Sequence, residues 1–380
     1  MKNNKIWLSS PHMGGTELNY INSAFENNWI APLGPNVVGF ENSIQQYLNK
    51  DKFIAALSSG TAALHLSLLM LGVNRDDFVI CQSMTFSASA NPIKYADAQP
   101  IFIDSEPQTL NMCPVALEKA INYSIDQGKK AKAVICVHLY GMPAKLDEIK
   151  AVCKKYEVPL IEDAAEALGS TYKDQKCGTF GDYGVLSFNG NKIITTSGGG
   201  ALICPSDEAQ KKVVFYATQA RDDAPHYQHS EIGYNYRLSN ISAGIGRGQM
   251  EVLDEHISLR RKMNAFYQEL FKEIDGITVF KEPNDDYFSN HWLSAILVDS
   301  TKTKNYINRE DLRLAFEAEN IESRPLWKPM HLQPVFKDAL YFGGTVAEDL
   351  FKDGLCLPSG SNLTDEDRER ISQVIHKLFK

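Results

Sequence analysis

A single lysine, Lys192, stands inside the segment SFNGNKIITTSGGG, residues 187–200. A serine and two asparagines precede it, and four small residues close the segment. A lysine becomes a nucleophile when it is withdrawn from water and given a partner, and it then forms Schiff bases with carbonyl groups. The surroundings of Lys192 therefore favour a chemical role over an ordinary place on an exposed loop.

Three other segments carry groups that suit such a lysine. In LSSGTAALHL, the residues Ser59, Gly60 and Thr61 stand between an apolar run and a helical pattern. Free backbone N–H groups and hydroxyls meet at such a helix start and can hold a phosphate. Asp163 closes the apolar run of VPLIEDAAEALGS, and Phe86 follows the apolar run DFVICQS. If the lysine binds an aromatic cofactor with a pyridine ring, an aspartate at a strand end favours the protonated ring nitrogen, and a phenylalanine at a strand end can lie flat against the ring.

Each of these features has a more ordinary explanation when it is taken alone. A Ser/Gly/Thr helix start is usually an N-cap, an aspartate after a strand often caps a helix, and a phenylalanine after a strand is normally core. Their combination with Lys192, and with a further hydroxyl at Ser187, is more specific. Together they are the groups that pyridoxal phosphate needs: a lysine, a phosphate cradle, an acid at the pyridine nitrogen and a ring partner.

The elements that must position these groups alternate between strands and helices. Continuous apolar strands separated by helices predict a mostly parallel sheet covered on both faces. Ligands bind outside the carboxyl ends of the strands in such sheets, which is where the four groups would meet. Strands are expected at residues 52–59, 77–83, 100–105, 132–141, 158–165, 183–188 and 200–204, and helices at residues 61–72, 113–127 and 145–157.

The pattern changes after these elements. Residues 205–250 are polar and aromatic with weak periodicity, which indicates an ordered functional loop, and a long helix is expected from about residue 248. Thr364 and Asp367 resemble a capping box before a final helix. We therefore predict an α/β protein with a large cofactor-binding domain over residues 1–250 and a smaller α+β domain over residues 251–380.

Composition limits the possible partners. Apolar residues make up 43% of the chain, and the formal net charge is −8, which is typical of a soluble protein and argues against nucleic-acid or anionic-membrane partners. The cysteines show no C-x-x-C spacing, the first residues lack the apolar core of a signal peptide, and no apolar run is long enough to span a bilayer. These features predict a cytoplasmic protein. His226 and His229 lack a further ligand cluster, so no metal is expected.

Several segments, taken in order, resemble the DegT/DnrJ/EryC1/StrS family of pyridoxal-phosphate-dependent sugar aminotransferases. They are LSSGTAALHL, MTFSASANPI, LIEDAAEALGS, GTFGDYGVLSFNGNKIITTSGGGAL and GYNYRLSN. The opening PHMGGTELNYINSAFENNWIAPLGP and the late RPLWKPMHLQPVF are also similar to this family. The resemblance covers nearly the whole chain. Within the family, the segments are most similar to the enzymes that aminate UDP-4-keto-6-deoxy sugars in the bacillosamine branch.

The resemblance implies an aspartate-aminotransferase-like fold of type I and a homodimer with shared active sites. It implies that Lys192 carries the cofactor as a Schiff base and that Asp163 faces the pyridine nitrogen. Glu166 matches a position, often glutamine in relatives, near the phenolic oxygen of the cofactor. The implied cofactor-binding residues are Ser59, Gly60, Thr61, Phe86, Asp163, Glu166, Ser187 and Asn235, the last from the neighbouring subunit. The residues implied to line the sugar-nucleotide pocket are Asn28, Trp29, Ile30 and Ala31, with Met330, His331, Leu332 and Gln333 from the partner chain.

The implied reaction moves an amino group from L-glutamate, which leaves as 2-oxoglutarate, to a nucleotide-linked keto-deoxy sugar. The resemblance favours C4 of UDP-2-acetamido-2,6-dideoxy-hexos-4-ulose and a role in surface glycan or glycoprotein biosynthesis, with Lys192 as the proton carrier. Two alternatives stay open: a dTDP-linked 3- or 4-ketosugar as the substrate, and a non-catalytic regulator that binds the cofactor or a nucleotide sugar on the same fold.

One segment departs from the family pattern. Many relatives have Gly-Glu-Gly-Gly where this chain has residues 197–200, Ser-Gly-Gly-Gly. The departure leaves Lys192 in place, which disfavours the dehydratases of the family that carry histidine there. A nicotinamide enzyme is also disfavoured, because the glycine cluster GIGRGQ has Gln249 where the dinucleotide fingerprint requires its last glycine.

Overall fold

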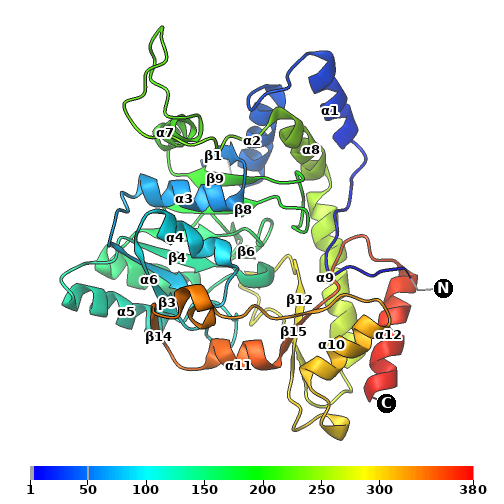
Figure 1. The fold of residues 1–380 in the computed structure, drawn as a ribbon. Helices are drawn as coiled ribbons and strands as arrows, with labels where there is room; N and C mark the ends of the chain where they lie inside the picture. Colours follow the sequence, from blue (N-terminus) through cyan, green and yellow to red (C-terminus); the bar gives the residue numbers. More distant parts are fainter. Residues whose placement is uncertain (1–3, 49–50, 380) are drawn as a thin grey trace.

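The structure is a computed structural model that describes residues 4–48 and 51–379. Its centre is an eight-stranded sheet with the strand order β1-β9-β8-β5-β4-β2-β3-β14 (Figure 1). Neighbouring strands are parallel except where β9 pairs with β1 and β8, so only β9 runs against the others. This confirms the predicted mostly parallel sheet. Its strands are β1 (Phe53–Leu57), β2 (Phe78–Gln82), β3 (Gln99–Ile103), β4 (Ala133–Val137), β5 (Leu160–Asp163), β8 (Tyr183–Ser187), β9 (Gly200–Cys204) and β14 (Leu340–Phe342).

Both faces of this sheet are buried. Successive residues of a strand point to opposite faces, and in β2 Val79 packs in one apolar cluster with α3 while Ile80 packs in another with α5 and α6. Helices on both faces explain why the strands read as continuous apolar runs rather than as alternating ones. The helices over the sheet are α3 (Gly60–Met70), α4 (Asn91–Tyr95), α5 (Pro114–Asp126), α6 (Leu146–Tyr156) and α7 (Asp207–Ala217).

Around residue 250, the helices of the structure differ from the prediction. Instead of one long helix from about residue 248, the structure has α8 (Asn240–Glu251) and α9 (Leu253–Phe271). The loop predicted over residues 205–250 therefore holds α7 near its start and most of α8 at its end. Three glycines lower the helical propensity of α8, but they let it pack closely on α1 (Glu17–Glu26) and α2 (Pro35–Tyr47). A Cβ at Gly246 would lie 2.7 Å from the ring of Phe40, and one at Gly248 would lie 2.8 Å from the backbone nitrogen of Glu17. The cluster GIGRGQ is therefore a helix-packing surface.

The C-terminal part forms a smaller α+β unit beside α9 (Figure 1). It holds a four-stranded sheet and a final helix whose predicted cap is present, since Thr364 and Asp367 exchange backbone-to-side-chain hydrogen bonds. β14 belongs to this part of the sequence but pairs with β3 at the edge of the large sheet. The domain division at residues 250/251 stays a prediction. The elements are β10 (Ile277–Val279), β12 (Ser294–Val298), β13 (Arg324–Pro325), β15 (Gly354–Leu357), α10 (Arg309–Ala318), α11 (Val346–Asp353) and α12 (Asp365–Phe379).

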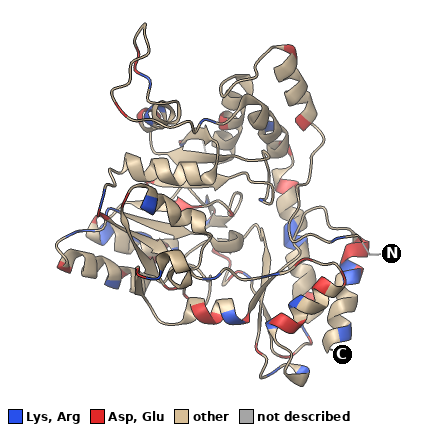
Figure 2. Ribbon diagram, in the orientation of Figure 1, with Lys and Arg blue, Asp and Glu red and all other residues tan. Residues whose placement is uncertain are grey.

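A small third sheet ties the two parts together. Its strands are β6 (Thr171–Tyr172), β7 (Gln175–Lys176) and β11 (Tyr287–Phe288), and β11 pairs with β6 across more than a hundred residues of sequence. Charged side chains lie mainly on outer helices such as α10, α11 and α12, while the central strands are mostly uncharged (Figure 2). Within residues 4–48 and 51–379, no helix is both long and apolar enough to cross a membrane.

Candidate active site

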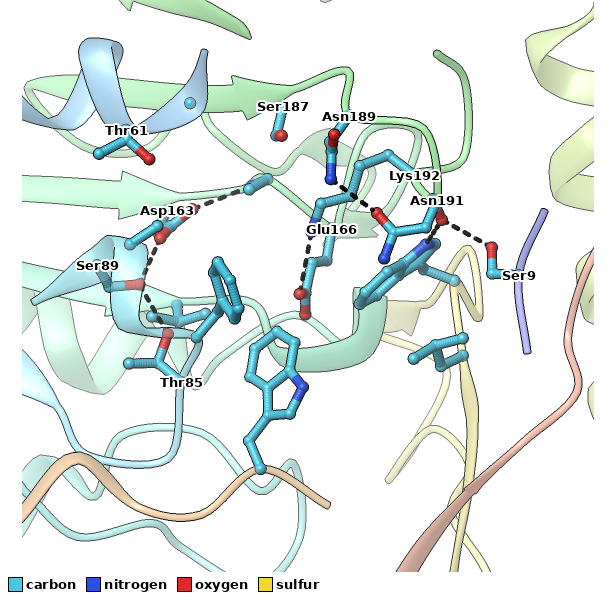
Figure 3. A pocket seen from close by; sticks show the side chains of 18 of the residues that line it. Ser9, Thr61, Thr85, Ser89, Asp163, Glu166, Ser187, Asn189, Asn191 and Lys192 are labelled. Carbon is cyan, nitrogen blue, oxygen red and sulfur yellow. Dashed lines mark hydrogen bonds and ion pairs between the residues drawn. The ribbon is translucent and has the colours of Figure 1, made fainter. Parts of the chain in front are cut away.

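A cavity of about 580 Å³ lies where β1, β5 and β8 end, at the carboxyl edge of the large sheet. β9 runs in the opposite direction, so its first residues reach the same edge. Lys192 lines this cavity together with every predicted cofactor-binding residue except Asn235. Figure 3 shows several of them converging from different strands. The volume falls in the range of cavities that bind small molecules and cofactors.

The proposed phosphate cradle is the start of α3. Ser59 caps this helix, because its side-chain oxygen accepts the N–H of Ala62 (3.0 Å). The first N–H groups of a helix have no acceptor in their own helix and carry the positive end of its dipole. Ser187 lies directly beside them, since a Cβ built at Gly60 would lie 3.2 Å from the Cβ of Ser187. Hydroxyls and free N–H groups therefore meet as the sequence predicts.

Asp163 is held rigidly at the end of β5. It is 5% exposed, and its carboxylate accepts the hydroxyl of Ser89 (2.6 Å) and the N–H of Ala165 (3.2 Å). Ser89 is in turn bonded to Thr85 (2.7 Å) (Figure 3). Ser89 and Thr85 were not predicted as site residues, although both belong to the segment MTFSASA that contains Phe86. These hydrogen bonds fix the direction of the carboxylate, as a partner for a pyridine nitrogen requires.

The amine of Lys192 has a buried acidic partner. Nζ lies 3.2 Å from Oε1 of Glu166, and the other oxygen of this carboxyl accepts the N–H of Tyr140 (2.7 Å). Burial raises the pKa of Glu166 to about 7, while the positive charge of Lys192 and the Tyr140 N–H act against this rise. The lysine is therefore desolvated and partnered, which is the condition that its predicted chemistry requires.

Aromatic rings form the wall opposite the sheet edge. Nζ of Lys192 lies 4.1 Å from the ring centroid of Trp292, whose Nε1 donates to the carbonyl oxygen of Asn191 (2.6 Å). The ring of Phe86 lies 5.6 Å from that of Trp327, and the two are tilted by 51°. Trp292 and Trp327 were missed by sequence reasoning because they lie outside the strand-end pattern. They enter the site only through the packing of the smaller unit against the large sheet.

The predicted substrate residues do not line this cavity within one chain. Residues 28–31 form an exposed turn, which Asn240 anchors through hydrogen bonds to the carbonyl oxygens of Trp29 (3.0 Å) and Ala31 (2.9 Å). Met330 is buried in the core of the large sheet, and His331 is bonded to Ser83 (2.7 Å).

The remaining predicted residues lie outside the cavity as well. Leu332 is partly exposed, Gln333 donates to the carbonyl oxygen of Lys328 (3.1 Å), and Asn235 is exposed. A role for Asn235 and residues 330–333 across a subunit boundary stays a prediction, and so does a place for residues 28–31 in the sugar-nucleotide pocket. No group of three metal-ligating side chains occurs among the described residues.

The cavity fits pyridoxal phosphate by its own chemistry. Ser59, Gly60, Thr61 and Ser187 would hold the phosphate, and Lys192 would bind the aldehyde carbon. A buried carboxylate whose hydrogen bonds come from neutral donors, as at Asp163, suits a protonated ring nitrogen. The acid, the lysine and the phosphate cradle lie at separate places on one sheet edge, which is the arrangement that an elongated aromatic phosphate needs.

Comparisons with known proteins agree with this fit. EpsN of Bacillus subtilis (strain 168), assigned provisionally as a pyridoxal-phosphate-dependent aminotransferase, is 52% identical over 99% of this chain and 96% of its own length. The GDP-perosamine synthase of Escherichia coli O157:H7 is 36% identical over 98% of each chain. The crystal structure of a DegT DnrJ EryC1 StrS aminotransferase from Brucella abortus superposes with a TM-score of 0.87 at 28% identity, over 96% of this chain and 95% of that one.

The family model matches nearly the whole chain, at residues 11–377. The match includes the strand-end residues of the cavity and the smaller unit that closes it. The fold is therefore that of the type I aminotransferases, and the cofactor is pyridoxal phosphate. The chain belongs to the DegT/DnrJ/EryC1/StrS aminotransferase family and is a pyridoxal-phosphate-dependent sugar aminotransferase.

Proposed function

We propose that this protein moves an amino group from L-glutamate to C4 of UDP-2-acetamido-2,6-dideoxy-hexos-4-ulose, as a step in surface glycan or glycoprotein biosynthesis. The observation that carries the catalytic part is the position of the Lys192 amine, 3.2 Å from Glu166 in the cavity that Asp163 and the start of α3 also line. The choice of this sugar nucleotide rests on the likeness of the sequence segments to bacillosamine-branch enzymes.

Each residue of the candidate active site has a separate part in the proposed reaction. When bound, pyridoxal phosphate supplies an aldehyde that takes up the amino group and a ring that stabilises negative charge. Lys192 holds the cofactor between turnovers and, once its amine is free, carries protons to and from the reacting carbon atoms. Asp163 keeps the ring nitrogen protonated, and the start of α3 with Ser187 anchors the phosphate.

We further infer that two copies of the chain form a homodimer with shared active sites. Large apolar side chains are exposed on α1, the following loop and α2, and a surface of this kind marks an interface. Two of the predicted substrate residues, Trp29 and Ile30, belong to this surface. A partner that covers it would contact the predicted substrate residues of the other copy. The exposed side chains are Leu18, Phe25, Trp29, Ile30, Leu33 and Val38, and we call them the N-terminal apolar surface.

The proposed cellular location of the protein is the cytoplasm. The cysteines at positions 81, 113, 136, 153, 177, 204 and 356 are all free thiols, and most of them are buried. Free thiols of this kind fit a reducing compartment. The formal net charge of −8 supports partners that are small molecules rather than nucleic acids or anionic membranes.

The catalytic part is tested by Lys192→Ala. We expect the rate of amino transfer to fall by at least about a thousandfold, because both the tether and the proton carrier are lost. Circular dichroism should stay that of the folded protein. The visible absorbance of the covalently bound cofactor should disappear. A variant that keeps the wild-type rate would contradict the role of Lys192.

The substrate is tested with purified protein, L-glutamate and a panel of UDP-, dTDP- and GDP-linked 3- and 4-ketosugars. The GDP-linked sugars belong in the panel because one relative is a GDP-perosamine synthase. We expect the UDP-linked 4-ketosugar to give the highest kcat/KM, with 2-oxoglutarate released and nitrogen at C4 by NMR. A regulator of the same fold would bind the cofactor and aminate none of these sugars.

A further inference from the structure

A buried cation without an acidic partner contacts two residues of the cavity wall. Arg260 of α9 is 1% exposed, and in the described part of the chain its hydrogen bonds all go to uncharged oxygen atoms. Burial lowers the pKa of this guanidinium to about 9. The next residue, Arg261, by contrast, pairs with Glu282 at 2.5 Å. Because burying a charge without a counter-charge is costly, the hydrogen bonds that Arg260 makes need an explanation.

These hydrogen bonds join three distant segments. Nη1 of Arg260 donates to the carbonyl oxygen of Trp292 (2.6 Å) and to that of Ser359 (3.3 Å). Nη2 donates to the hydroxyl of Ser9 (3.0 Å). Both Trp292 and Ser9 line the cavity, although they lie far apart in the sequence. Arg260 therefore holds the N-terminal segment and the smaller unit against the same wall.

Ser9 and Trp292 then meet on one acceptor, the carbonyl oxygen of Asn191. Ser9 Oγ donates to it at 2.7 Å, a contact drawn in Figure 3, and Trp292 Nε1 donates to it at 2.6 Å. Arg260, Ser9, Asn191 and Trp292 form a closed ring of hydrogen bonds, which we call the Asn191 ring. The shared acceptor of this ring, the carbonyl group of Asn191, directly precedes Lys192 in the chain. Nζ of Lys192 lies 4.1 Å from the centroid of the Trp292 indole.

We propose that Arg260 and Ser9 are positioning residues for Lys192. They fix the peptide that precedes the lysine and the aromatic ring beneath its amine, and so the place from which the amine transfers protons. The proposal rests on the proposed function, in which Lys192 carries those protons. Small displacements of a proton carrier slow transfer strongly, with about 100-fold lost for a misplacement of roughly 1 Å.

The competing explanation is a clamp that serves stability alone. In that case, loss of the Asn191 ring would lower the midpoint of thermal unfolding and leave the kinetics of the folded protein unchanged. The two explanations differ in what happens to proton transfer in molecules that are folded and loaded with cofactor. The test therefore measures proton transfer and stability on the same variants.

Ser9→Ala is the cleanest change, because the Ser9 hydroxyl is both the acceptor for Arg260 and a donor to Asn191. Ser10→Ala is the matched control, since the neighbouring hydroxyl bonds to Asn362 (3.2 Å) and does not line the cavity. Ser9→Thr restores a hydroxyl. The holoenzyme is mixed with L-glutamate or its α-deuterated form in a stopped-flow instrument, and the first half of the reaction is followed by cofactor absorbance.

We expect Ser9→Ala to slow this half-reaction about tenfold and to raise its deuterium isotope effect, with Ser9→Thr largely restored and Ser10→Ala unchanged. The cofactor-free Ser9→Ala protein should also take up pyridoxal phosphate covalently several-fold more slowly, to the same final stoichiometry. Equal isotope effects and uptake rates in Ser9→Ala and Ser10→Ala would overturn the proposal, as would a rate loss that only follows the folded fraction.

Two further variants complete the test. Trp292→Phe keeps an aromatic side chain but removes the Nε1 donor to Asn191, so its deuterium isotope effect should rise as in Ser9→Ala. An unchanged isotope effect would count against the role of the Asn191 ring.

Lys192→Ala separates the positioning role from the proposed function. If it retains amino transfer, the proposed function fails. If it loses amino transfer while Ser9→Ala behaves as Ser10→Ala does, only the positioning role fails.

Discussion

Glu166 shows how one side chain can link the site to the stability of the fold. The carboxyl is fully enclosed between Lys192 and the N–H of Tyr140, and burial raises its pKa from 4.5 to about 7. The folded protein thus binds this proton more tightly than the unfolded chain does. Its contribution to stability is complete below about pH 4.5 and falls as the pH rises toward 7.

Glu166→Gln should remove this pH dependence. In the cofactor-free protein, we expect the difference between the free energies of unfolding at about pH 5 and pH 8 to shrink by up to roughly 3 kcal/mol, at 1.36 kcal/mol for each pKa unit. Urea unfolding at both pH values measures it. Glu322→Gln is a control on the same cavity wall: burial raises the pKa of Glu322, but the Leu8 N–H and Arg324 outweigh it and the net shift is downward. A lowered pKa affects stability only as the pH falls below about 4.5, so that control should leave the difference between pH 5 and pH 8 nearly unchanged. A Glu166→Gln variant that keeps the wild-type difference would refute the assignment.

At the scale of elements, the start of β9 touches the start of α3. A Cβ at Gly200 would lie 2.3 Å from the carbonyl carbon of Ser59 and 2.4 Å from the nitrogen of Gly60. A Cβ at Gly198, in contrast, would meet nothing within 4 Å. Within the segment that departs from the family pattern, Gly200 is therefore required by backbone contact, and Gly198 has open space beside it. Nothing in the structure explains why a serine stands at position 197.

Gly200 and Gly190 make a matched pair for a test of the phosphate cradle. Gly200→Ala should push β9 away from the start of α3 and weaken binding of pyridoxal phosphate at least tenfold, or about 1.4 kcal/mol. Gly190→Ala should leave the dissociation constant within about twofold, since a Cβ there meets nothing within 4 Å and Gly190 does not line the cavity. Titration of the cofactor-free proteins with pyridoxal phosphate measures both constants. Equal dissociation constants for the two variants would show that the close approach of β9 and α3 does not shape the cradle.

At the scale of the whole molecule, the N-terminal apolar surface should decide the oligomeric state. Phe25→Glu places a charge in this surface, where the Phe25 side chain is 63% exposed in one chain. We expect the dimer dissociation constant to rise at least about 100-fold and amino transfer to fall with it. Analytical ultracentrifugation over a range of concentrations measures the change. Val115→Glu on α5, at 65% exposure, is the control; if both variants sediment as the wild type does, this surface is not the interface.

Much of the fold could be predicted because its signals are local. Apolar runs such as 77–83 and 158–165 became β2 and β5 as expected. The first helices, α1 and α2, and the early start of α8 were not predicted. Their sequences are weakly apolar or rich in glycine, and these helices are stabilised by packing on one another.

The sequence by itself determined which side chains are the candidates for the chemistry. Ser59, Asp163 and Ser187 each stand at the end of a recognisable strand or the start of a helix, and parallel strands bring such ends to one edge. Only the tertiary structure decided what surrounds Lys192. Ser9 and Trp292 meet at Asn191 from 182 and 101 residues away, and no local pattern encodes such contacts, because they arise when the smaller unit and the N-terminal segment pack against the sheet.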